Sequence, residues 1–166
     1  MNLLDELRVD AAYTRSINLE RDWESESTAE PRSYVPTPRA CEVLERFLAV
    51  QQPSDQPRAW ALIGPYGSGK SAFALFLAKL LSRPDSPGVV SALRVLKSAD
   101  PRLARGVKRL TKDGQGYCAV LLTGSPEPLA KRFLMALEHA AIQFWSSRKG
   151  RSPQVIGRIR VALELE

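Results

Sequence analysis

The sequence predicts an α/β fold, in which a parallel sheet carries helices on both faces. Two short apolar runs, residues 59–63 (AWALI) and 117–123 (YCAVLLT), are typical of fully buried strands. Each is followed by a loop and then by a helical pattern, at residues 71–81 and 125–146. This order of strand, loop and helix, occurring twice, favours parallel strands joined by crossover helices.

The first third of the chain is predicted to hold two helices with a polar segment between them. The apolar residues of 1–12 predict a short amphipathic helix. The polar segment 13–33 contains an acidic run, and we expect it to be extended or mobile. Thr37 is typical of a helix N-cap and Pro38 of a first helical position, so a helix is expected over residues 37–52.

Further helices are expected between and after the two strands. Residues 89–97 favour a helix, and residues 101–112 predict a basic one that ends at the turn 113–116. Ser125 and Pro126 are typical of a helix start, here for the helix that runs to about residue 146. Residues 155–166 alternate weakly and are expected to begin another element.

Composition and charge suggest one domain with two flanking segments. The chain has 166 residues, of which 44% are hydrophobic, and no apolar run is long enough to span a membrane. We expect an acidic extension (1–33), a central domain (34–146), and a basic linker that leads into a further element (147–166). With two cysteines and no signal peptide, a cytoplasmic location is expected.

The charge is distributed unevenly along the chain. Residues 1–30 have a net charge of −5 and residues 31–166 a net charge of +11. A basic body of this kind is suited to bind polyanions, and the acidic leader is alternatively suited to dock on it. Trp23, within the leader, is a candidate to hold it against the body or a partner.

One motif points directly to a chemistry. The pattern G-x-x-x-x-G-K-[ST], known as the P-loop or Walker A motif, is matched by Gly64, Pro65, Tyr66, Gly67, Ser68, Gly69, Lys70 and Ser71. In such a loop the glycines let backbone N–H groups turn toward an anion, and Lys70 is expected to reach the β- and γ-phosphates. Ser71 is the expected Mg²⁺ ligand, and Ser71 and Ala72 open a helix whose dipole favours phosphate. Lys70 is therefore the catalytic candidate.

With this motif and its context in view, residues 34–82 resemble the P-loop NTPases, in the branch of AAA+ and signalling ATPases. The resemblance implies ATP and Mg²⁺ as ligands, a P-loop parallel sheet, and a position near the adenine ring for residues 34–36. The residues of the loop, with Tyr-Val-Pro-Thr-Pro-Arg upstream, are also similar to those of large ATP-binding proteins of bacterial phage-defence systems of the BREX type.

The chain departs from the family at the Walker B strand, which ends in Asp or Asp-Glu. The run 117–123 ends in Thr-Gly-Ser with no acid, and no other run of four apolar residues ends in Asp-Glu. The pattern also looks unfinished at residue 166, so we expect an incomplete domain, the ATP-binding module of a larger ATPase. A GTPase is disfavoured because no Asn-Lys-x-Asp motif is present.

A basic stretch provides the remaining signal. Arg102, Arg105 and Arg109 fall on one face of the expected helix 101–112, where they are suited to contact nucleic-acid phosphates, DNA among them. Two alternatives to the ATPase module follow. In a small P-loop kinase these arginines would serve a lid, and in a non-hydrolysing adaptor they would bind nucleic acid. Oligomers or a larger complex remain open.

Overall fold

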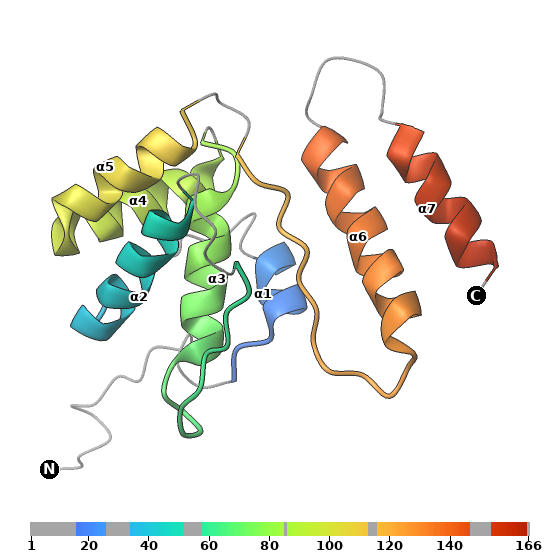
Figure 1. Ribbon diagram of the computed structural model, residues 1–166, viewed down its shortest axis with the longest axis horizontal. Coiled ribbons are helices and arrows are strands. Elements are labelled where there is room, and N and C mark those ends of the chain that lie inside the picture. The colour runs from blue at the N-terminus through green and yellow to red at the C-terminus, as the bar shows by residue number, and fades with distance from the viewer. Residues whose placement is uncertain are drawn as a thin grey trace, which may run out of the picture.

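The computed structural model places seven helices in the part of the chain that it describes and no strand (Figure 1). The residues described are 16–25, 34–51, 58–84, 86–112, 116–146 and 154–165. The expected fold class, an α/β parallel sheet, is therefore wrong for these residues, which form helices joined by turns and extended segments.

Neither run expected to be a strand forms a β-ladder with another segment that the structure describes. Residues 59–63 are exposed, and the side chain of Ile63 is 94% accessible. Residues 117–123 run past α1 and α6 and are mostly half-buried, and the N–H of Tyr117 donates to the carbonyl of Leu81 at 2.7 Å. Apolar, β-branched composition reports a local preference, whereas a strand also needs a neighbour that completes its hydrogen-bond ladder.

The sequence signals for the next helices are confirmed. Helix α2 (Pro38–Val50) begins where expected, because the Thr37 hydroxyl accepts a hydrogen bond from the Ala40 N–H at 3.2 Å. Helix α3 (Lys70–Leu81) follows the glycine-rich loop, within one residue of the expected start.

Helices α4 and α5 are also capped by side chains from the preceding turn. Helix α4 (Pro87–Ala99) is capped by Ser86, and α5 (Pro101–Leu110) by Asp100. The Asp100 carboxylate accepts from the N–H groups of Arg102 and Leu103 at 2.8 and 3.1 Å, and these bonds lower its pKa. Both helices carry proline at their first position, which lacks the N–H that a helix start leaves unsatisfied.

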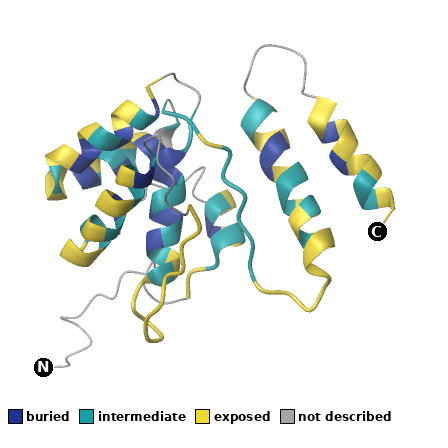
Figure 2. Ribbon diagram, in the orientation of Figure 1, coloured by how far each residue is buried: buried dark blue, intermediate teal, exposed yellow. Residues whose placement is uncertain are grey.

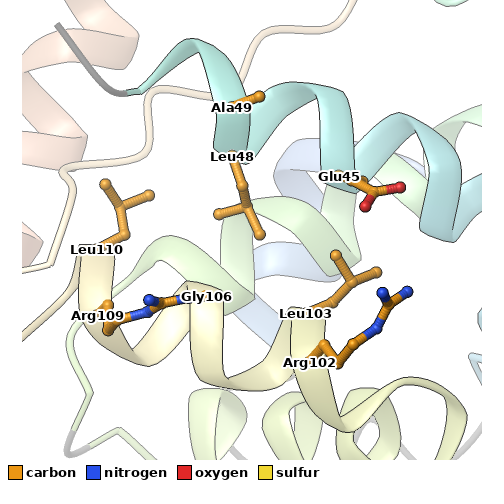
Figure 3. Close-up of a pocket in the computed structure, with 8 residues that line it drawn as sticks. All are labelled: Glu45, Leu48, Ala49, Arg102, Leu103, Gly106, Arg109 and Leu110. Carbon is orange, nitrogen blue, oxygen red and sulfur yellow. The ribbon is translucent and has the colours of Figure 1, made fainter.

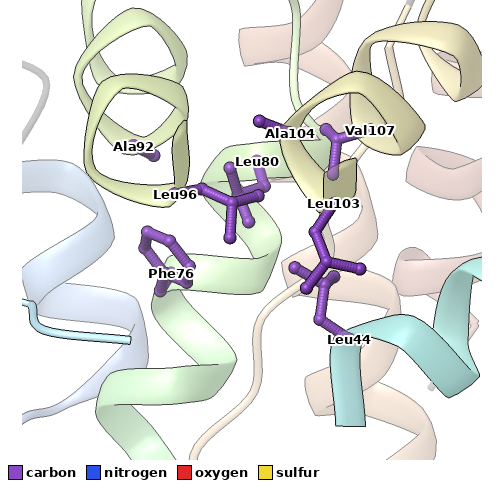
Figure 4. Packing of buried hydrophobic residues seen from close by; sticks show 8 residues of the cluster. All are labelled: Leu44, Phe76, Leu80, Ala92, Leu96, Leu103, Ala104 and Val107. Atoms are coloured by element: carbon purple, nitrogen blue, oxygen red, sulfur yellow. The ribbon is translucent and has the colours of Figure 1, made fainter. Parts of the chain in front are cut away.

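Four helices, α2 to α5, enclose one hydrophobic core. Figure 4 shows this cluster, which consists of Leu44, Phe76, Leu80, Ala92, Leu96, Leu103, Ala104 and Val107. Within α3, α4 and α5 these positions are one to four residues apart, so that each helix turns one face inward, as the buried positions of Figure 2 show. Because α3 is part of this core, the loop before it leads into a firmly packed helix.

The acidic leader contains a helix that the sequence did not predict. Residues 19–25, expected to be extended or mobile, form α1 (Leu19–Ser25), which packs against α3. Asn18 caps it, since its side-chain oxygen accepts from the Arg21 N–H at 3.0 Å, while the Asn18 N–H donates to Asp22 at 2.8 Å. The helix expected at 1–12 lies outside the described residues.

The last two helices form an antiparallel pair beside the main core (Figure 1). Helix α6 (Leu129–Ser146) begins four residues later than expected, because Ser125 instead closes a turn by accepting from the Glu127 N–H at 3.2 Å. Helix α7 (Gln154–Glu164) replaces the weakly alternating element. Arg160 of α7 pairs with Glu138 of α6 at 2.6 Å. Most of the expected basic linker lies outside the described residues.

Candidate functional site

The candidate site is the loop of residues 64–69, which leads into α3. Gly67 and Gly69 have positive φ angles of 78° and 80°. A side chain at either position would be strained, so the loop needs glycine there even though a Cβ atom would meet nothing within 4 Å. The Ser68 N–H donates to the Pro65 carbonyl at 3.3 Å and closes the turn. The sequence pattern correctly indicated a tight glycine turn.

Lys70, the first residue of α3, turns its ammonium back onto the loop. Its Nζ donates to the carbonyls of Gly64 and Pro65 at 3.0 and 2.7 Å and to the Ser68 hydroxyl at 3.2 Å. The three donors of the ammonium thus contact three oxygens of a single loop. This arrangement holds a positive charge at the mouth of the loop in this structure.

The start of α3 adds backbone donors beside that charge. Its N-cap residue, Gly69, has no side chain to cap the helix, and the Phe73 N–H donates to the Gly69 carbonyl at 2.9 Å. The N–H groups of Lys70, Ser71 and Ala72 precede that bond, as in the first turn of any helix. A helix start without a side-chain cap offers donors and a partial positive charge to an anion.

The loop is accessible from solvent. Figure 1 places it at the N-terminal end of α3, and Figure 2 colours residues 64–69 as exposed. Tyr66 is 94% accessible, and its hydroxyl lies 3.4 Å from that of Ser16. Ser71 is exposed and Lys70 half-buried. Tyr34 is the first residue of the segment expected near the adenine ring. Its ring stacks on Phe76 of α3, with ring centres 4.4 Å apart.

The basic residues singled out in the sequence lie elsewhere. Helix α5 packs on α2 and α4, and Figure 1 shows it away from the loop. A groove of about 520 Å³ separates α2 from α5, with Arg102 and Arg109 on the α5 side and Glu45 on the α2 side (Figure 3). Arg105 is exposed but does not line this groove. The structure therefore does not bring these arginines to the loop, as a kinase lid would require.

A second cluster of charges was not predicted from the sequence. Glu20 of α1 accepts hydrogen bonds from Arg132 of α6, through both carboxylate oxygens at 3.0 Å, and Glu24 lies 3.2 Å from His139. These contacts border a cavity of about 220 Å³ that Trp23 also lines. The only sequence signal for these contacts was the opposite charge of the acidic leader and the basic body. Of the two interpretations of that charge, binding of polyanions or docking of the leader on the body, these contacts favour docking.

Neither of the two thiols has the lowered pKa of a reactive cysteine. Burial raises the pKa of both thiols, Cys41 and Cys118, which disfavours the reactive thiolate. Within the described residues, no cluster of three or more His, Cys, Asp or Glu side chains is arranged to hold a metal ion. None of the described helices combines the length and hydropathy needed to span a membrane.

Comparison of the chain with protein-family models, with curated proteins and with solved structures found no match.

Proposed function

We propose that this chain is an ATP-binding module that holds Mg²⁺-ATP through residues 64–71. The observation that carries the proposal is the position of the Lys70 ammonium, which contacts oxygens of Gly64, Pro65 and Ser68. The Lys70 ammonium already lies at the loop, and the helix start beside it has no side-chain cap. Together they supply the positive charge and the N–H donors that a polyphosphate requires.

Each loop residue has a role in this proposal. Lys70 exchanges its contacts with loop oxygens for contacts with the β- and γ-phosphates, where it acts as a point charge. The N–H groups of Ser71 and Ala72 contribute donors, and the exposed Ser71 hydroxyl is the oxygen that would hold Mg²⁺. When bound, Mg²⁺ neutralises charge on the phosphates. These residue types fit the ligand, because hard cations prefer oxygen donors.

The experiment is calorimetric titration with Mg²⁺-ATP of the wild-type chain, Lys70→Ala and Lys131→Ala. Lys131 is an exposed lysine on α6 and serves as a charge-matched control. Loss of Lys70 is expected to weaken binding by about 10- to 100-fold, since hydrogen bonds to charged groups contribute about 1.5–3 kcal/mol. Lys131→Ala is expected to bind like the wild type. Equal affinity of all three proteins would overturn the proposal.

The Ser71→Ala variant tests the metal ligand separately. Titration with ATP in the presence and absence of Mg²⁺ is expected to show a large Mg²⁺ effect in the wild type and a small one in this variant. An unchanged Mg²⁺ effect would remove Ser71 from the proposal while leaving the role of Lys70 intact. GTP is included as a competitor, because the sequence contains no guanine-specific motif.

The proposal does not include ATP hydrolysis, and turnover is measured in parallel. The residues of a Walker B strand are not found in any apolar run of the sequence. We further propose a cytoplasmic location, where ATP and Mg²⁺ are plentiful and where the two free thiols would stay reduced. A switch of contacts with a partner on nucleotide binding is part of the same proposal.

A further inference from the structure

The outer surface of α5 is densely positive. Its exposed cations, with those of the turn that follows, are Arg102, Arg105, Lys108, Arg109 and Lys112. Among the described residues one ion pair involves this group, between Arg102 and Asp100 at 3.5 Å. The other four have no carboxylate partner within the part of the chain that the structure describes.

The acid beside them contributes little to neutralising this surface. One oxygen of Asp100 caps α5 and the other pairs with Arg102, so this acid offsets one of the five positive charges. Across the groove, Glu45 is the one acidic side chain among the lining residues. The positive charge of α5 is therefore left largely uncompensated by neighbouring groups.

The groove gives this surface a shape as well as a charge. Its apolar part includes Leu48 of α2 and Leu103 and Leu110 of α5, and Arg102 and Arg109 line the same wall (Figure 3). These two arginines are seven residues apart, which is about 10 Å along a helix axis. Charges spaced in this way along an open surface are suited to a long, regularly charged ligand rather than to one small anion.

We propose that α5 and the rim of the α2–α5 groove bind the phosphate backbone of double-stranded DNA, independently of sequence. The four cations within α5, Arg102 to Arg109, lie along about 10 Å of helix, or one positive charge per ~3 Å, whereas duplex DNA carries one negative charge per ~1.7 Å. No aromatic side chain occurs between residues 101 and 112. Base stacking, on which most single-strand binding depends, is therefore not provided here. This surface is separate from the nucleotide loop.

The test is fluorescence anisotropy of a labelled duplex of about 20 base pairs, long enough to span the charged face of α5, titrated with protein at several KCl concentrations and without nucleotide. Two matched double variants are compared, Arg105→Ala/Arg109→Ala on α5 and Lys131→Ala/Arg158→Ala on α6 and α7. All four residues are exposed, and each pair removes two charges. Alanine is the best helix former, and circular dichroism checks that helix content is retained.

The slope of log K against log[KCl] is negative, and the α5 variant is expected to make it less steep by about 1.8, at about 0.9 for each phosphate that the protein no longer neutralises. The control variant is expected to leave that slope within error of the wild type. Equal reductions in both variants would overturn the proposal, because they would report net charge rather than a surface on α5.

A third variant tests the same surface through an expected increase in affinity for the duplex. Glu45→Gln removes the acid of the groove and is expected to tighten duplex binding about two- to fivefold, as exposed charge pairs do. Unchanged or weaker binding by this variant would contradict the role of the groove rim. Competition distinguishes other partners: displacement of the duplex by polyglutamate or by single-stranded DNA at equal charge concentration would overturn duplex DNA as the ligand.

Discussion

Glu20 and Thr123, 103 residues apart in the chain, are joined by two short hydrogen bonds. The Glu20 Oε1 atom accepts from the backbone N–H of Thr123 at 2.7 Å and from its hydroxyl at 2.6 Å. The same carboxylate contacts Arg132. Helix α1 is thereby tied to the extended segment 116–125 and to α6, while its other side packs on α3. Glu20 thus joins α1 to α6 and to the segment before it, and α1 in turn packs on α3, the helix that follows the loop.

Removal of this carboxylate is expected to destabilise the fold. Glu20→Gln weakens bonds that are charge-assisted, and we expect a loss of about 1 kcal/mol in unfolding free energy, since the side chain is one third exposed and solvent screens it. Urea denaturation at pH 7 measures this. Glu42→Gln is the control, because Glu42 is 54% exposed and pairs with Arg39 on the helix surface. A loss as large in the control would contradict the assigned role of Glu20.

The same contacts predict how stability depends on acid. Hydrogen bonds from the Thr123 hydroxyl and N–H, together with Arg132, hold the pKa of Glu20 below its ordinary value of 4.5. A carboxyl whose pKa is lower when folded contributes stability above its unfolded pKa and loses it as pH falls through the folded value. The Glu20→Gln difference from wild type is therefore expected to shrink below about pH 4.5. A difference that stays constant down to about pH 3, below that ordinary value, would contradict this.

The burial of Lys79 predicts that the free energy of unfolding depends on pH in the alkaline range. It is 5% exposed, and burial lowers its pKa to about 8, against the attraction of Asp22. Between pH 8 and the ordinary lysine value of 10.5, the unfolded chain binds more protons than the folded one, so stability rises with pH. From about pH 7.5 to about pH 9.5 we expect the unfolding free energy of the wild type to rise by about 2 kcal/mol relative to that of Lys79→Met, a comparison in which the titration of the two thiols cancels. Lys131→Met, exposed on α6, is expected to keep the gain, and a gain that persists in Lys79→Met would contradict the assignment.

Two glycine substitutions are expected to act in opposite directions. Gly69→Ala places a Cβ atom on a residue with a φ of 80°, which costs about 1–2 kcal/mol and disturbs the loop that holds Lys70. Gly157→Ala, in the interior of α7 with open space around it, is expected to stabilise by about 0.5–1 kcal/mol. Thermal melts of both variants measure the contrast, and a stabilised Gly69→Ala protein would contradict the loop geometry.

Leu96 tests the core that supports α3. It is fully buried among residues of α2 to α5, so Leu96→Ala is expected to lose about 2–5 kcal/mol through reduced burial and a residual cavity. Leu129→Ala, at a position 76% exposed on α6, is expected to change stability by less than about 0.5 kcal/mol. Chemical denaturation compares the two, and equal losses would show that the core is not centred on these helices.

Much of the helical structure could be predicted, because it depends on neighbours within a few residues. Thr37 caps α2, and prolines begin α4 and α5, at positions where each residue acts through its own backbone geometry. The glycines of the loop were predictable for the same reason, since Gly67 and Gly69 occupy positive φ. Helix α1 was missed although Asn18 caps it locally, and the contacts of Glu20 and Glu24 with α6 lie too far along the chain to be predicted.

The sequence by itself determined the local conformations: the capped helices α2, α4 and α5, the tight glycine loop, and Lys70 at the first turn of α3. The tertiary structure alone decided whether residues 59–63 and 117–123 had strand partners, where the arginines of α5 lie relative to the loop, and how Glu20 meets Thr123. The physical reason is the separation along the chain over which each kind of contact forms. Caps and turns close within about four residues, whereas ladders, grooves and ion pairs need segments that only the folded chain brings together.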